Sequence, residues 1–303
     1  IYQCDWSSDV CSSDLERPFE PQEKAATRKI CHGGYRVERL AGLYWAYLGP
    51  QPAPLLPRWD IMVRRDGPLT IHVMPDVACN WLQVMENSVD STHTYYLHGL
   101  MMIKHGLPHI GAYYAKPFED CDFEVERQKT WAGVRKVRVY GDERERGHPL
   151  IFPCILLVPA EGHIYMHFRV PIDDFNTRIL RLRFTPGGDV TGMDWDNPKI
   201  IIEPPYKNAE GEYVMNTFAS QDAMAWETQG PILDRTQEML GASDRGVALY
   251  RRMLREEIDA VREGRDPVGV LRDPSLNERI VIEVSQGQVK DAPKMNAAMK
   301  AAE

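Results

Sequence analysis

The sequence has no long apolar run, no excess of positive charge and no regular cysteine motif. Its longest apolar stretch, Ile151 to Val158, contains Pro153 and has the length of a strand, whereas a membrane-spanning helix needs about 18 apolar residues. Lys and Arg total 36 against 44 Asp and Glu, a formal net charge of −8. Nucleic-acid-binding domains usually carry a positive face. These deficits argue against a membrane-spanning protein and against a nucleic-acid-binding one.

The six cysteines form no C-x-x-C, C-x-H or C-x-x-H pattern. The start of the chain also shows no basic region, apolar core or cleavage site of a signal peptide. We therefore expect reduced, mostly buried thiols and a cytoplasmic protein.

The first fifteen residues, IYQCDWSSDVCSSDL, differ in character from the rest of the chain. The run from Asp5 to Leu15 resembles a translated sequencing adapter. We expect residues 1–15 to be such an artefact rather than a polar tail, and the reading frame to be cut before Glu16.

Hydrophobic periodicity predicts an α+β protein. Period-two patterns predict two short strands within 35–48, and further strands at 70–77, 122–131, 134–140, 155–158, 163–170 and 177–184. Helical patterns cover 80–98 and, after Ser220, most clearly 247–261. Irregular structure is expected at 99–117 and 186–212, and the DERER run at 142–146 is expected to be a solvated turn. An antiparallel, curved sheet wrapped against the long C-terminal helix would enclose a ligand cavity.

One segment, residues 79–99, gathers ionisable side chains at helical spacing. Glu86, Asp90 and His93 share one helix face, because they are four and three residues apart. His98 lies five residues beyond His93, which separates the two rings on a regular α-helix. The rings converge only if the helix is widened or broken, for example by a π-bulge, a feature common at functional sites.

Two histidines and one carboxylate form the facial triad of non-haem iron(II) oxygenases, which leaves coordination positions open for dioxygen and water. The carboxylate could come from Asp90 nearby or from Asp222, on a second helical stretch that ends at Gly230-Pro231. Zinc is the second metal option, and a histidine pair five apart can also be accidental.

Four further histidines are candidates, namely His105, His109, His163 and His167. His163 and His167 lie on one face of a predicted strand, where packing or lining a pocket is the favoured role.

Three segments together carry a family resemblance that covers about residues 35–265. The pattern N-W-L-Q-x-x-E-N-x-x-D-x-x-H-x-x-x-x-H at 80–98 resembles the iron-binding signature of the Rieske-type aromatic-ring-hydroxylating oxygenases, large (α) subunit. QDAMAWETQGPILDRTQEMLGASDRGVALYRRML resembles the C-terminal part of the phthalate 4,5-dioxygenase-like branch, and GLYWAYLGPQPAPLLP the strand and linker that leave the Rieske domain.

The resemblance implies roles for individual residues. His93, His98 and Asp222 become ligands of a mononuclear Fe²⁺, and Asp90 the acidic residue that bridges an iron-ligating histidine to the Rieske cluster of a neighbouring subunit. Glu86 and Glu227 become supporting acids, with plain surface positions as the alternative.

The resemblance also implies a helix-grip (START/Bet v 1-like) catalytic domain that hydroxylates an aromatic, carboxylated substrate with O₂, by ring dihydroxylation or O-demethylation. Electrons would come from NAD(P)H through a separate reductase, with or without a ferredoxin, and the full-length protein would be a homotrimer. Arg169 or Arg178 could hold the substrate carboxylate, although solvated strand charges are the favoured interpretation of each.

One departure from the family pattern concerns the [2Fe–2S] cluster, whose ligands come from a C-x-H and a C-x-x-H motif. Neither motif is present. We therefore expect residues 16–57 to be a C-terminal remnant of a Rieske domain and 58–303 the catalytic mononuclear-iron domain, inactive alone.

Two other functions fit parts of the pattern. A helix-grip carrier of small ligands would use the same cavity without catalysis, and a zinc hydrolase would use the same ligand types. Iron content separates both from an oxygenase.

Overall fold

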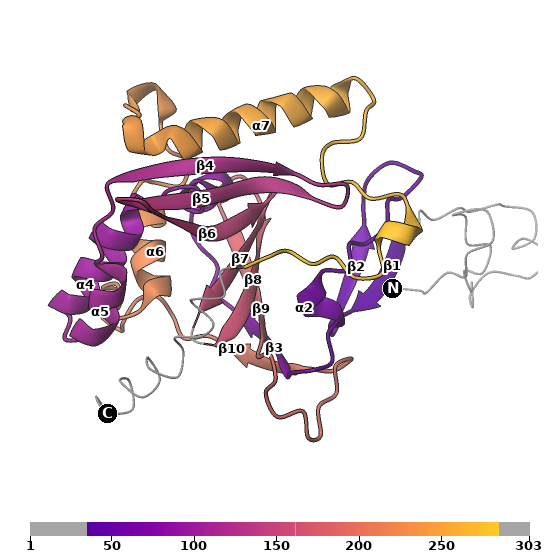
Figure 1. Cartoon of the computed structure of the whole chain (residues 1–303), viewed down its shortest axis with the longest axis horizontal. Helices are drawn as coiled ribbons and strands as arrows, with labels where there is room; N and C mark the ends of the chain where they lie inside the picture. The colour runs from indigo at the N-terminus through magenta and orange to yellow at the C-terminus, as the bar shows by residue number, and fades with distance from the viewer. Residues whose placement is uncertain (1–34, 161, 285–303) are drawn as a thin grey trace, which may run out of the picture.

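The computed structural model describes residues 35–160 and 162–284 (Figure 1). One large sheet contains strands β3 (Leu69–Val73), β4 (Asp120–Arg127), β5 (Ala132–Tyr140), β6 (Glu143–Ile151), β7 (Ile155–Ala160), β8 (His163–Pro171), β9 (Thr177–Phe184) and β10 (Lys199–Ile202). Their order is β10-β3-β9-β8-β7-β6-β5-β4. All neighbours are antiparallel except β10 and β3. The α+β class predicted from the sequence is thus confirmed.

The two faces of the sheet differ because side chains alternate along each strand. On β9, Leu180, Leu182 and Phe184 belong to an apolar core. This outer face packs against the hairpin of β1 (Arg36–Leu40) and β2 (Leu43–Tyr47), against α2 (Asp60–Val63), and against the segment 271–284 with its short helix η4 (Pro274–Leu276).

The opposite, inner face of the sheet packs against three helices, α3 (Trp81–Asn87), α6 (Phe218–Glu227) and α7 (Arg245–Arg262). Helix α7 lies along β4 and β5 at the top of Figure 1. Buried Met85 of α3 and buried Tyr250 of α7 share a core with Val134 and Leu150 of the sheet. Helix α3 is therefore held between the sheet and α7, which fixes the segment that follows it.

The segment 99–117, expected to be an irregular loop, instead contains α4 (Leu100–Lys104) and α5 (Pro108–Tyr114), which follow the π-helix η1 (Thr94–Gly99). Its glycines are packing positions rather than loop signals. A Cβ on Gly99 would lie 2.7 Å from the Ala115 amide nitrogen, and one on Gly111 would lie 2.7 Å from the Gly99 carbonyl oxygen. The loop prediction was wrong because close helix packing and loop flexibility both select glycine.

Two strands were also missed. The DERER run is not a solvated turn alone, since β6 begins at Glu143. Its arginines pair with acids of β4: Arg144 with Asp122 at 2.8 Å and Arg146 with Glu124 at 3.0 Å. Strand β10 lies within 186–212, where only irregular structure was expected. The rest of the chain adds the short helices η2 (Arg235–Gln237) and η3 (Ala242–Asp244).

The predicted domain division stays a prediction. Residues 1–34, which include the expected artefact and part of the expected remnant, lie outside the described residues. The described part of 16–57 includes the β1–β2 hairpin, which packs on the sheet. Within 35–160 and 162–284, no helix has the length and apolar character needed to cross a membrane.

Candidate metal centre

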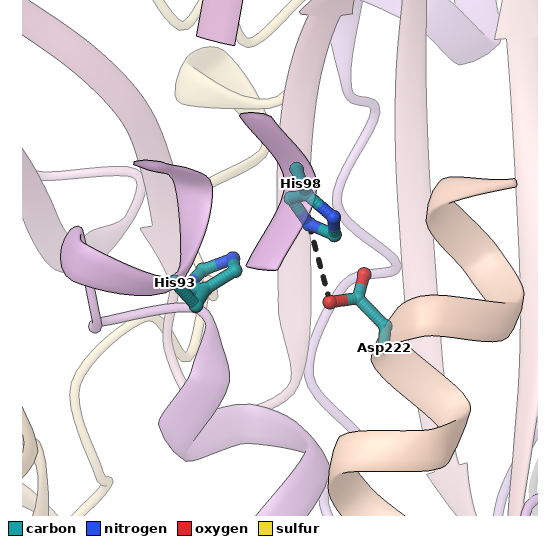
Figure 2. A group of neighbouring side chains, drawn as sticks. All are labelled: His93, His98 and Asp222. Carbon is teal, nitrogen blue, oxygen red and sulfur yellow. Dashed lines mark ion pairs between the residues drawn. The ribbon is translucent and has the colours of Figure 1, made fainter. Parts of the chain in front are cut away.

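Three side chains distant in sequence meet on the inner side of the fold. One potential ligand atom from each of His93, His98 and Asp222 lies within 4.8 Å of the others. Figure 2 shows the two rings and the carboxylate around a common space, with the His98 Nε2 atom 3.3 Å from the Asp222 Oδ1 atom. The ring centroids of His93 and His98 are 5.1 Å apart. The structure thus brings together the three residues proposed from the sequence as metal ligands.

A π-helix makes this convergence possible. After α3 ends, the Asp90 carboxylate accepts hydrogen bonds from the backbone N–H groups of Thr92 (2.8 Å) and His93 (3.0 Å). This arrangement caps the next helical segment. The π-helix at Thr94–Gly99 then widens the turn, so that residues five apart come to one side. The widened helix predicted from the five-residue histidine spacing is confirmed.

Each histidine is oriented through its Nδ1 atom. Asp90 Oδ2 lies 3.0 Å from His93 Nδ1, and Gln221 Oε1 lies 2.8 Å from His98 Nδ1. The Gln221 Nε2 atom donates to the Met215 carbonyl (2.8 Å), which fixes the amide oxygen toward the ring. Both Nε2 atoms are left for the shared point. This support of a ligand ring is typical of metal centres.

The charge state of the three groups suits a cation. Burial acts to raise the pKa of Asp222, but the adjacent His98 and His93 lower it to about 2. Burial lowers the pKa of His93, whereas the pKa of His98 is raised because the Asp222 carboxylate outweighs burial. Two imidazole nitrogens and one ionised carboxylate fit ferrous iron, and the same set fits zinc.

The supporting acids proposed from the sequence have structural contacts. Glu86 is buried and pairs with Arg235 at 2.9 Å and with Arg251 at 2.6 Å. Glu227 accepts hydrogen bonds from the Ala78 amide and the Tyr213 hydroxyl. Glu86 therefore holds α3, which precedes the two histidines, and Glu227 holds α6, which carries Asp222; neither carboxylate joins the cluster.

The other candidates also lie elsewhere. Arg178 forms an exposed pair with Asp76 at 2.8 Å, as the solvated interpretation predicts. Arg169 contradicts that interpretation, because it is buried and donates to the Val84 carbonyl and the Ser88 hydroxyl of the α3 segment. His105, which follows α4, and His109 of α5 are exposed. His163 and His167 lie on β8, in the sheet.

Lys136 was not singled out from the sequence. It is buried on β5, and its Nζ atom donates to the Asp90 carbonyl at 3.3 Å. Burial lowers its pKa to about 8, from an ordinary value of 10.5. No local pattern marks it, because its burial depends on the segment that follows α3.

This lysine gives a pH-dependent stability. Between pH 8 and 10.5 the native protein releases the Lys136 proton while the unfolded chain retains it. Stability therefore rises with pH, with a slope that approaches about 1.4 kcal/mol per unit for one proton. We expect Lys136→Met to remove this rise in urea unfolding series across that range. Exposed Lys129→Met is the control, and identical profiles for the parent and Lys136→Met would contradict the assignment.

Comparisons with known proteins find similarity to oxygenase subunits. The family model "LigXa C-terminal domain like" matches residues 208–292, which include Asp222. The chain is 32% identical over 282 residues to the 5,5'-dehydrodivanillate O-demethylase oxygenase subunit of Sphingobium sp., covering 91% of this chain and 64% of that protein. It is 25% identical to the phthalate 4,5-dioxygenase oxygenase subunit of Pseudomonas putida, covering 87% and 68%.

A solved structure shows the same fold. The Pseudomonas putida CBB5 NdmA QL mutant with caffeine matches with a TM-score of 0.52 at 17% identity, over 82% of this chain and 66% of that one. The chain spans less than two thirds of the length of the O-demethylase subunit. Over the region compared, the chain is similar to the oxygenase subunits of an O-demethylase and of a phthalate dioxygenase.

Proposed function

We propose that this chain is the catalytic part of an oxygenase component that hydroxylates an aromatic substrate with O₂ at a mononuclear iron. His93, His98 and Asp222 would hold the metal. One observation carries the proposal: ligand atoms of these three residues, from two distant segments, meet within 4.8 Å. A small-ligand carrier does not require a cluster of metal ligands. The similarity to oxygenase subunits does not favour a carrier or a zinc hydrolase.

The surrounding residues have definable tasks. Ferrous iron, when bound, supplies the redox chemistry that activates dioxygen. Asp90 and Gln221 hold the two imidazoles in orientation through their Nδ1 atoms. Phe218 packs edge-on against His98, with ring centroids 5.0 Å apart, and Tyr114 packs on Phe218 at 4.8 Å. These aromatic rings shield one side of the centre from water.

The names of the relatives support an aromatic acid as substrate. One is an O-demethylase named for 5,5'-dehydrodivanillate, and the other a dioxygenase named for phthalate. We infer a carboxylated aromatic substrate, converted by O-demethylation or by ring dihydroxylation.

Electrons would come from NAD(P)H through a separate reductase, with or without a ferredoxin, in a cytoplasmic homotrimer. Asp90 would connect the centre to a [2Fe–2S] cluster in a neighbouring subunit. The sequence contains neither of the cysteine–histidine motifs that bind this cluster, so the residues present do not fit it.

Anaerobic reconstitution tests the proposal. We expect the purified chain to bind one Fe²⁺ per molecule, measured by elemental analysis after removal of loose metal. Once a [2Fe–2S] domain is supplied, oxygen uptake with a reductase and an aromatic acid should require that iron. Retention of zinc with oxygen-independent hydrolysis, or of no metal at all, would refute the function.

A further inference from the structure

The inner face of β8 and β9 carries buried hydrogen-bond donors that lack acceptors. Among the described residues, five buried side-chain nitrogen or oxygen atoms have no hydrogen-bond partner, and all five are N–H donors. Four lie on the side of the sheet that faces α3 and α6: Arg169 Nε, Arg181 Nε, Arg183 Nε and Trp226 Nε1. Buried donors without partners are rare in folded proteins. A group of donors without a single unpaired acceptor calls for an acceptor from outside the chain.

Arg181 is the least engaged of the three arginines. Arg169 is held by Val84 and Ser88 of the α3 segment, and the Arg183 Nη2 atom lies 2.5 Å from His163 Nε2. Within the part of the chain that the structure describes, the Arg181 guanidinium makes no hydrogen bond and no ion pair. A guanidinium carries five donors in a rigid fork, so Arg181 has both its charge and its geometry available.

The neighbours of Arg181 offer no competing anion. Its cross-strand partners are His72 on β3 and His167 on β8. The nearby carboxylate of Glu203 is already engaged with His72 at 2.6 Å. His167 is buried, and burial together with Arg181 and Arg169 lowers its pKa well below the ordinary value. The row therefore presents one unpaired cation beside the buried ring of His167.

The same face lies within electrostatic reach of the metal centre. Burial lowers the pKa of Arg181, and Tyr206, Asp222 and Glu203 partly oppose that effect. A buried charge without a partner is costly, and an apolar side chain would be more stable there. Retaining an arginine at this position is explained if a bound ligand supplies the negative charge.

We propose that Arg181 binds the carboxylate of the aromatic substrate and so determines the preference for acids over neutral aromatics. Arg169 and Arg183, held by their own contacts, add positive potential on either side. A planar guanidinium and a carboxylate form two parallel hydrogen bonds, which would orient the ring as well as bind it. This role of Arg181 rests on the proposed function in one respect: the bound acid is the substrate of the adjacent centre.

Ligand binding to the metal-free full chain tests the assignment without turnover. The probes are benzoate and biphenyl-3-carboxylate, each compared with its neutral amide in calorimetric titrations. The variants are Arg181→Gln, Arg181→Lys and the matched control Arg178→Gln, which removes the same charge from the exposed side of β9. Thermal unfolding of each variant reports whether the fold is intact.

We expect at least one acid to bind more tightly than its amide. Arg181→Gln should weaken acid binding by about 10- to 100-fold, as expected for loss of a charge-assisted pair, and leave amide binding unchanged. Arg181→Lys should fall between parent and Arg181→Gln, and Arg178→Gln should match the parent.

Any of three results would overturn the assignment. They are equal affinities of Arg181→Gln and the parent for the acids, equal binding of acids and amides by the parent, and no binding of either acid. Iron binding, measured after the same preparations are reconstituted with Fe²⁺, separates the two proposals. Acid binding that depends on Arg181 in a chain unable to hold iron would refute the oxygenase function and keep the anion site.

Discussion

Replacing Asp222 by alanine is expected to lower iron affinity by more than about 100-fold, because it removes the single anionic ligand of the three. The two imidazoles that remain are neutral when they bind a metal and cannot offset the charge of Fe²⁺. Burial of this carboxylate against His98 and His93 also means that no exposed acid can take its place. Competition with a chelator of known affinity measures the change.

The control for Asp222 is Asp76→Ala, which removes an exposed carboxylate paired with Arg178. This variant should bind iron like the parent. If Asp222→Ala also bound iron like the parent, with an unchanged circular dichroism spectrum, the carboxylate would not be a ligand.

Replacing Glu86 by alanine is expected to destabilise the fold by about 1.5–3 kcal/mol, the cost of losing charge-assisted hydrogen bonds, because Arg251 keeps its pair with Glu238. Glu86 on α3 is 8% exposed and accepts hydrogen bonds from Arg235 and from Arg251 of α7. Without it, the charges of both arginines lose their link to α3. Urea unfolding at neutral pH gives the difference in free energy of unfolding.

Glu256 provides the matched comparison for this acid. It is an exposed glutamate on α7 that pairs with Arg127 at 3.4 Å, and pairs of that kind contribute at most about 1 kcal/mol. We expect Glu256→Ala to unfold almost like the parent. Losses of similar size in the two variants would show that Glu86 is not the link between α3 and α7.

The sequence predicts part of the local site. The five-residue step from His93 to His98 requires the widened helix that the structure contains, an inference that depends on neighbours within a few turns. The hairpin around Ala41-Gly42 is confirmed for the same reason, since Ala41 and Gly42 both have positive φ values of 54° and 75°. The shared helix face of Glu86, Asp90 and His93 was wrong, because α3 ends at Asn87 and the chain turns before the next helical segment.

Contacts between distant segments are less predictable. Gln221 orients His98 across 123 positions of the chain, and nothing local distinguishes it from a surface amide beside Asp222. Arg169 and Arg181 have the alternating pattern of solvated strand charges, yet α3 and α6 cover that face of the sheet. The burial of a strand arginine depends on which helix packs over it, and that information is spread over the whole chain.

The π-helix makes the centre sensitive to residue count rather than to residue type alone. Each widened turn accommodates one more residue than an α-helical turn would. Deleting a single codon between Thr94 and Leu97 would restore ordinary helical winding and turn the second imidazole by about 100° around the axis. The number of residues in this turn therefore decides whether the second imidazole reaches the centre, and loss of one residue would disable the centre without touching any ligand.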